Sequence, residues 1–237
     1  MSPLWSLVRA EWTKTRTVAS TTWLLMAAAV LTIGVGMAVS AVVRYQVGTD
    51  QDPVTLSLAG LQLGQALVAM YAVLAITGDY VSGMIHTTLI AGPRRLCVLS
   101  AKALVTTVLV AAAGTAAVLG SLTGGRALQP HNGFTPQHGF ALITLTNHAA
   151  VGSIGHLCLI ALLGTGIALA VRDSAAAIGI VLALLYLFPI AAGLVTDPRW
   201  QRRIDHVGPT TAGLGVLVVW ATGLFLIGAA LLLTRDA

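Results

Sequence analysis

The chain has little charge, and none of its charged residues lies inside any of its six long apolar stretches. Only 9% of the 237 residues are charged, whereas 57% are hydrophobic and the mean hydropathy is +0.88. A soluble protein of this length would distribute Lys and Glu along the outer faces of its helices. The composition therefore excludes an ordinary soluble domain.

The six apolar stretches predict the architecture. They cover roughly residues 18–43, 54–77, 103–122, 141–171, 174–196 and 212–234. A helix rises about 1.5 Å per residue, so about 20 apolar residues cross a hydrocarbon core about 30 Å thick. We expect an all-α integral membrane protein with six transmembrane helices.

Carboxylates are absent from these stretches, although a proton- or sodium-driven carrier usually keeps Asp or Glu inside the membrane to bind its coupling ion. All eight acidic residues lie in predicted loops or at helix ends. The chain also lacks a GxxxxGK[ST] phosphate loop and any soluble segment long enough for a nucleotide-binding domain. Any uphill transport would therefore draw its energy from outside the membrane.

Metal and nucleic-acid chemistry are equally poorly supported. Two cysteines, Cys97 and Cys158, form neither a disulfide framework nor a CxxC motif. The histidine spacings fit no zinc signature, and we expect no metal site; these histidines are His131, His138, His148 and His156. The pI near 9.8 reflects membrane topology, because no basic stripe with interleaved aromatic residues indicates a nucleic-acid partner.

The basic residues predict the orientation, since short cytoplasmic loops carry an excess of Lys and Arg. With both termini inside, the inner segments hold eight basic residues: Arg9, Lys14, Arg16, Arg94, Arg95, Lys102, Arg172 and Arg235. The outer segments hold five: Arg44, Arg126, Arg199, Arg202 and Arg203. We therefore expect cytoplasmic N- and C-termini.

Residues 1–17 predict an amphipathic helix that lies in the membrane interface. Trp5 and Trp12 fall on its apolar arc, and Arg9 and Arg16 lie beside that arc. Trp rings favour headgroup depth, while arginine side chains extend towards anionic lipid. A basic leader that only sets topology is the alternative.

The most informative polar segment is residues 78–102. Gly78 is expected to end one helix and Asp79 to cap a short amphipathic helix over 79–92. Pro93 stops that helix, and Arg94, Arg95 and Lys102 form a basic group at the start of the next span. An ordinary cytoplasmic loop with topogenic arginines is the alternative interpretation.

This segment resembles the permease subunits of ABC-2 type transporters. The matching positions are Asp79, Gly83, Thr87, Thr88, Leu89, Pro93, Arg94, Arg95, Ala101 and Lys102. His86 stands where a basic Arg is common in that family. The opening Arg9-Ala10-Glu11 and Gly208-Pro209 before the last span add to the resemblance, which extends over the whole chain in layout.

The resemblance implies a single ABC-2 type transmembrane domain over residues 1–237, in a bacterial plasma membrane. It implies an exporter in which two permease copies, alike or different, work with separate ATP-binding subunits that hold ATP and Mg. This chain would then be no enzyme and bind no cofactor itself. Residues 79–92 would dock on the ATPase, with coupling or anchoring roles for these residues: Asp79, Gly83, His86, Arg94, Arg95 and Lys102.

Within the spans, Gly60 and Gly64 form a small-xxx-small face that is a candidate subunit interface. Polar residues of the fourth stretch are candidates for lining a transport pathway: Asn147, His148, Ser153 and His156. Hydrogen bonding to neighbouring helices is the plainer interpretation of these groups.

Three other functions stay open. Ser153 between glycines, with His156 nearby, resembles an intramembrane serine protease only superficially, because the order is GSxG and the last stretch has no His. A channel would need a ring-forming charged or carbonyl motif, which is not visible. A sensor, scaffold or assembly factor would need no ATPase partner.

Overall fold

A computed structural model describes residues 5, 8–13, 19–45, 52–81, 95–134, 143–194, 208 and 213–235. Most of these residues are helical, and none of them forms a strand. The elements are α2 (Ala19–Val42), α3 (Pro53–Ser57), α4 (Leu61–Val81), α6 (Arg95–Leu128), the 3₁₀ turn η1 (Gln129–Asn132), α7 (Ile143–Val171), α8 (Ser174–Leu182), the π-helix η3 (Ala183–Leu187), α9 (Phe188–Leu194) and α11 (Leu214–Arg235).

Five helices in the described part of the chain are long and apolar enough to cross a membrane. They cover Thr22–Val42, Leu61–Tyr80, Cys97–Asn132, His148–Val171 and Leu214–Leu232. The apolar helix Ser174–Ile190 is shorter. The all-helical class is confirmed, and the five helices indicate a multi-pass membrane protein.

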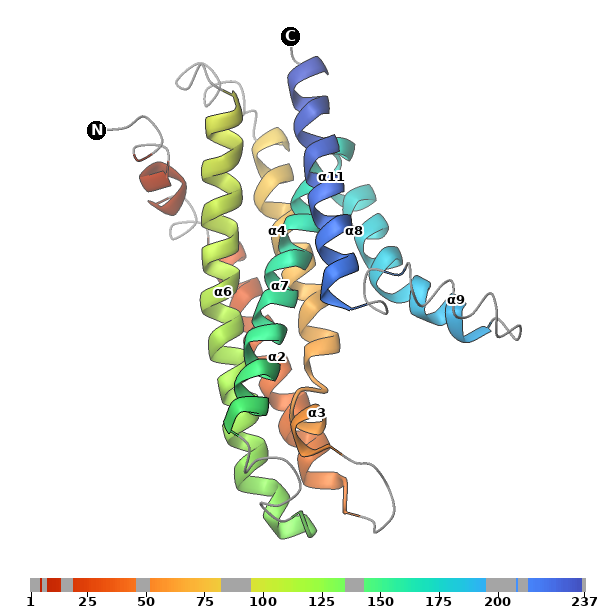
Figure 1. Cartoon of the computed structure of the whole chain (residues 1–237). Coiled ribbons are helices and arrows are strands. Elements are labelled where there is room, and N and C mark those ends of the chain that lie inside the picture. Colours follow the sequence, from red (N-terminus) through yellow and green to blue (C-terminus); the bar gives the residue numbers. More distant parts are fainter. Residues whose placement is uncertain are drawn as a thin grey trace.

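The helices form an elongated bundle (Figure 1). The end of α4, the start of α6, the turn between α7 and α8 and the end of α11 lie at one end, which we call the Asp79 end. The end of α2, η1 and the start of α7 lie at the opposite end. α8 packs against α4 and α7, whereas α9 diverges from the bundle and lies well apart from α4.

The second apolar stretch does not form the single helix predicted over 54–77. Asp52 caps α3 by accepting hydrogen bonds from the backbone nitrogens of Val54 at 3.1 Å and Thr55 at 3.3 Å. The chain then turns through residues 58–60 before α4 begins. At Gly60 a Cβ atom would overlap the Thr32 carbonyl oxygen, so this close backbone approach to α2 requires glycine.

The predicted helix boundary at Gly78 and Asp79 is wrong, because α4 continues through both residues to Val81. A glycine inside a helix costs only about 1 kcal/mol relative to alanine. Burial of the last turn of α4 against its neighbours, which includes Ile76 and Asp79 at 2% and 5% exposure, offsets that cost.

A tight turn joins α7 to α8. Arg172 has a left-handed backbone with φ of 62°, and Asp173 caps α8 by accepting a hydrogen bond from the Ala176 nitrogen at 2.7 Å. The π-helix follows directly, in front of Pro189. Proline lacks an N–H and its ring collides with the carbonyl four residues earlier, which accounts for the local widening of the helix.

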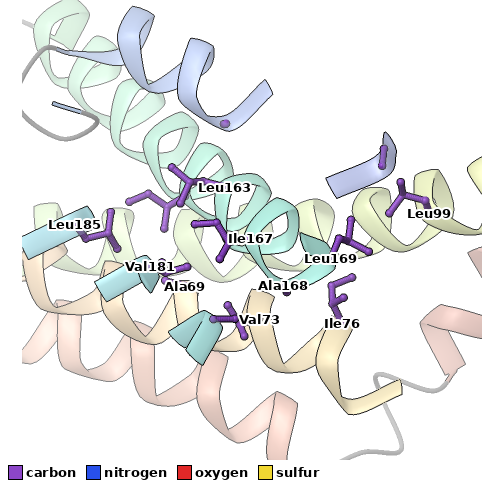
Figure 2. Packing of buried hydrophobic residues seen from close by; sticks show 14 of the residues in the cluster. Ala69, Val73, Ile76, Leu99, Leu163, Ile167, Ala168, Leu169, Val181 and Leu185 are labelled. Atoms are coloured by element: carbon purple, nitrogen blue, oxygen red, sulfur yellow. The ribbon is translucent and has the colours of Figure 1, made fainter. Parts of the chain in front are cut away.

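The largest core lies where α7 packs between α4, α8 and α11. Figure 2 shows Ala69 and Val73 of α4 gathered with Leu163 and Ile167 of α7 and with Val181 of α8. On the other side of α7, glycines bring two backbones together: a Cβ at Gly166 would lie 2.6 Å from the Phe225 nitrogen of α11. α7 is a single uninterrupted helix from Ile143 to Val171, so this segment contains no re-entrant break.

Candidate functional site

A buried ion pair joins α4 to α6 at the Asp79 end. Nζ of Lys102 donates a hydrogen bond to Oδ2 of Asp79, and the two residues are only 9% and 5% exposed. A buried charge needs a partner, because transfer of an isolated ion out of water costs several kcal/mol or more. The pair therefore ties together the two helices that flank residues 82–94.

A second contact at this end joins α4 to the turn between α7 and α8. The guanidinium carbon of Arg172 lies 5.4 Å from the ring centroid of Tyr80, which is the distance of a cation–π contact. Tyr80 follows Asp79 in α4. The last turn of α4 thus contacts α6 through one residue and the α7–α8 turn through the next.

The structure describes the side chains of only two residues of the predicted coupling group, Asp79 and Lys102. Asp79 and Lys102 were each expected to contact or anchor a partner, and the structure pairs them with each other. Gly83, His86 and Arg94 lie outside the described residues, and Arg95 begins α6 with its side chain outside the description. The sequence signal for the pair was present, since the opposite charges of Asp79 and Lys102 lie near the two ends of the polar segment 78–102.

The predicted N-terminal anchor is described in part. Residues 8–13 are helical, Oγ1 of Thr13 donates to the Arg9 carbonyl at 2.9 Å, and Trp5, Arg9 and Trp12 are exposed. Arg16 lies outside the described residues. The interfacial position of this helix stays a prediction.

A polar cluster extends from the buried side chain of Gln65 to the surface of the bundle and connects α4, α7 and η3. Nε2 of His156 is 3.0 Å from Oε1 of Gln65, and Nε2 of Gln65 donates to Oε1 of Gln62 at 3.0 Å. The Tyr186 hydroxyl donates to the Gln62 carbonyl oxygen. We call these four residues, Gln62, Gln65, His156 and Tyr186, the glutamine–histidine cluster.

The cluster lies far from the charged end of the bundle. Gln65 is 14 residues from Asp79 along α4, and Tyr186 is 13 residues from Asp173 along α8 and η3. At about 1.5 Å per residue these separations correspond to roughly 20 Å, and Gln65 still lies within the apolar span Leu61–Tyr80. Hydrogen bonding is therefore the condition for burying Gln65, which is 1% exposed.

Of the four cluster residues, sequence reasoning singled out only His156. Gln62 and Gln65 are three positions apart in an apolar stretch, so they share a helix face, which was the available signal. Tyr186 had no such signal, because its position depends on the π-helical turn of η3.

The other predicted pathway residues do not join this cluster. His148 is exposed near the start of α7 and Ser153 is half-buried, while the Asn147 side chain lies outside the description. Nε2 of His156 bonds Gln65 rather than Ser153 in the described contacts. Among the described residues, no three His, Cys, Asp or Glu side chains come together as metal ligands.

The prediction that Gly60 and Gly64 form a subunit interface is wrong. Both glycines are buried against α2 of the same chain, and a Cβ at Gly64 would overlap the Thr32 hydroxyl. Farther from the Asp79 end, Nε2 of Gln129 donates to the Pro53 carbonyl at 2.9 Å and the Ser57 hydroxyl at 3.2 Å. Small and polar residues thus fasten α2, α3 and η1 within one chain.

An apolar recess of about 470 Å³ lies between α6, α7 and α11. Its hydroxyl groups bond to their own helices: Thr107 donates to the Ala103 carbonyl at 2.8 Å and Thr222 to the Val218 carbonyl at 2.7 Å. The recess therefore offers apolar surface without a polar anchor, unlike the glutamine–histidine cluster.

No known protein-family model matches the chain, and no curated protein matches it in sequence.

Proposed function

We propose that the chain is the membrane-spanning subunit of an ATP-driven transporter of the ABC-2 type, and that it works as an exporter. Residues 82–94 would contact a separate ATPase subunit on the cytoplasmic side. The observation that carries the proposal is the ion pair of Asp79 and Lys102, which joins the helices on either side of that segment. A movement of the segment is thereby passed to α4 and α6 together.

The same proposal includes six membrane crossings with both chain ends in the cytoplasm. In this proposal Ser174–Leu194 supplies the sixth crossing, since 21 residues in a straight α-helix would reach about 30 Å. The end of α11 and the start of α6 lie at the Asp79 end of the bundle, which supports a common cytoplasmic side. The N-terminal helix then lies in the cytoplasmic interface.

The test is affinity purification of the tagged chain in mild detergent, with identification of what co-purifies and an ATPase assay. We expect an ATPase with a phosphate loop to co-purify. Arg94→Ala with Arg95→Ala should lower the recovery of the ATPase and the stimulation of its activity.

The matched control is Arg202→Ala with Arg203→Ala, a second adjacent arginine pair that topology places outside. This control should leave both readouts unchanged. If the tagged chain purifies without any ATPase under conditions that preserve a known permease complex, the proposal fails and a stand-alone sensor, scaffold or assembly factor replaces it.

A further inference from the structure

We infer that the glutamine–histidine cluster binds the uncharged polar group of an amphiphilic molecule, with the apolar part of that molecule lying along α9. The inference builds on the proposed transporter function, for which this site would hold the cargo. The cargo would be an amphiphile with a hydroxyl or amide headgroup.

The cluster extends from the buried core to the surface of the bundle. Gln65 is buried, whereas Gln62 is exposed and its bond from Tyr186 lies at the surface. Gln62 is the second residue of the apolar span Leu61–Tyr80, so its exposed amide lies at the end of that span, the level at which an amphiphile holds its polar headgroup. An amide donates two hydrogen bonds and accepts two, and the bond from Gln65 uses only part of the capacity of the Gln62 side chain.

The helices that form the cluster contain no charge at this depth. The sequence has no Lys, Arg, Asp or Glu within 61–78, 143–171 or 174–196. A charged headgroup would therefore lack an opposite charge from these helices, and burying an unpaired ion is far more costly than burying a hydrogen-bonded neutral group. The geometry selects a neutral group that both donates and accepts.

The surroundings of the cluster supply the apolar half of the site. Leu187 and Ile190 are 60% and 57% exposed, and Leu63, beside Gln62, is also exposed. α9 diverges from the bundle directly after the π-helical segment that carries Tyr186 (Figure 1). Single π-helical turns are frequent at functional sites, where they redirect a side chain. The exposed part of the glutamine–histidine cluster thus adjoins an apolar surface.

The test uses three photoreactive probes with the same alkyl chain and a diazirine beside the headgroup. The headgroups are a hydroxyl, a carboxylate and a quaternary ammonium. The full chain is purified, placed in lipid nanodiscs and irradiated with each probe, and labelled peptides are identified by mass spectrometry. We expect the hydroxyl probe to label peptides of α4 or α8–α9, and the charged probes to label them at least about fivefold less.

Variants of the cluster assign the labelling to this site. Gln65→Leu and His156→Leu should reduce labelling by the hydroxyl probe about five- to tenfold, the loss expected when one buried hydrogen bond is removed. The matched control His131→Leu changes an exposed histidine in η1 and should have no effect. His156→Gln keeps a donor and an acceptor and should retain most of the labelling.

If a leucine variant loses its helical fold, Tyr186→Phe replaces it in the test, because this substitution removes only one hydroxyl group. Equal labelling by the three headgroups, or unchanged labelling in both Tyr186→Phe and Gln65→Leu, overturns the inference. The probe assay contains no ATPase. Uniform labelling with a co-purifying ATPase refutes the binding site alone, whereas selective labelling without an ATPase refutes the transporter and leaves the amphiphile site.

Discussion

Lys102 of α6 donates a hydrogen bond to Asp79 of α4 across 23 residues of sequence, and both side chains are buried. Neither charge would be stable at this position without the other. The pair therefore fixes the relative position of α4 and α6 at the Asp79 end of the bundle.

Breaking the ion pair should cost more than removing it. Lys102→Met leaves the Asp79 carboxylate buried without its partner, and we expect a loss of about 3–5 kcal/mol in stability. Asp79→Asn combined with Lys102→Met removes both charges and should recover a large part of that loss. Thermal unfolding of the purified variants in one detergent measures the difference. A double variant as unstable as the sum of the single variants would contradict a direct pair.

Gly166→Ala should separate α7 from α11. The added Cβ would lie 2.6 Å from backbone atoms of Leu224 and Phe225, and backbone cannot move aside as a flexible side chain does. Overpacking of this kind costs about 1–3 kcal/mol.

The matched control is Gly155→Ala on the same helix, where a Cβ meets no atom within 4 Å. It should leave stability unchanged or raise it by up to about 1 kcal/mol, because alanine is the better helix former. Thermal unfolding separates the two substitutions, and equal effects would argue against close packing of α7 and α11.

Arg172→Gly should be more stable than Arg172→Ala. Both substitutions remove the cation–π contact with Tyr80, but only glycine adopts a φ of 62° without steric cost. The expected difference is about 1 kcal/mol in favour of glycine, measured by thermal or denaturant unfolding. A more stable alanine variant would show that the left-handed turn between α7 and α8 is not maintained.

Cysteine accessibility should place the two ends of the bundle on opposite sides of the membrane. In a background with Cys97→Ser and Cys158→Ser, His131→Cys should react with a membrane-impermeant maleimide on intact cells. Ser174→Cys, at the Asp79 end, should react only after permeabilisation. Reaction of both on intact cells would refute the proposed orientation, and the opposite pattern would invert it.

The class of fold follows from composition alone, because six charge-free stretches of membrane-spanning length leave helix as the conformation that satisfies the backbone in hydrocarbon. Although α6 extends from Arg95 to Leu128, beyond the predicted 103–122, the predicted ends of α2, α7 and α11 lie within two residues of the observed ends. These features depend on local composition, so they can be predicted from a single chain.

Tertiary contacts decided the rest. Gly78 and Asp79 have the local character of a helix end, yet α4 continues through them to Val81, where its last turn is buried and Lys102 of α6 neutralises Asp79. Gly60 and Gly64 fit a subunit interface as well as an intramolecular one, and only the position of Thr32 on α2 distinguishes the two. Gln65, His156 and Tyr186 come from three separate segments, and their meeting depends on how far each helix is rotated about its axis. Hydropathy measures the length of a helix in the membrane but not that rotation, which is set by the packing of its neighbours.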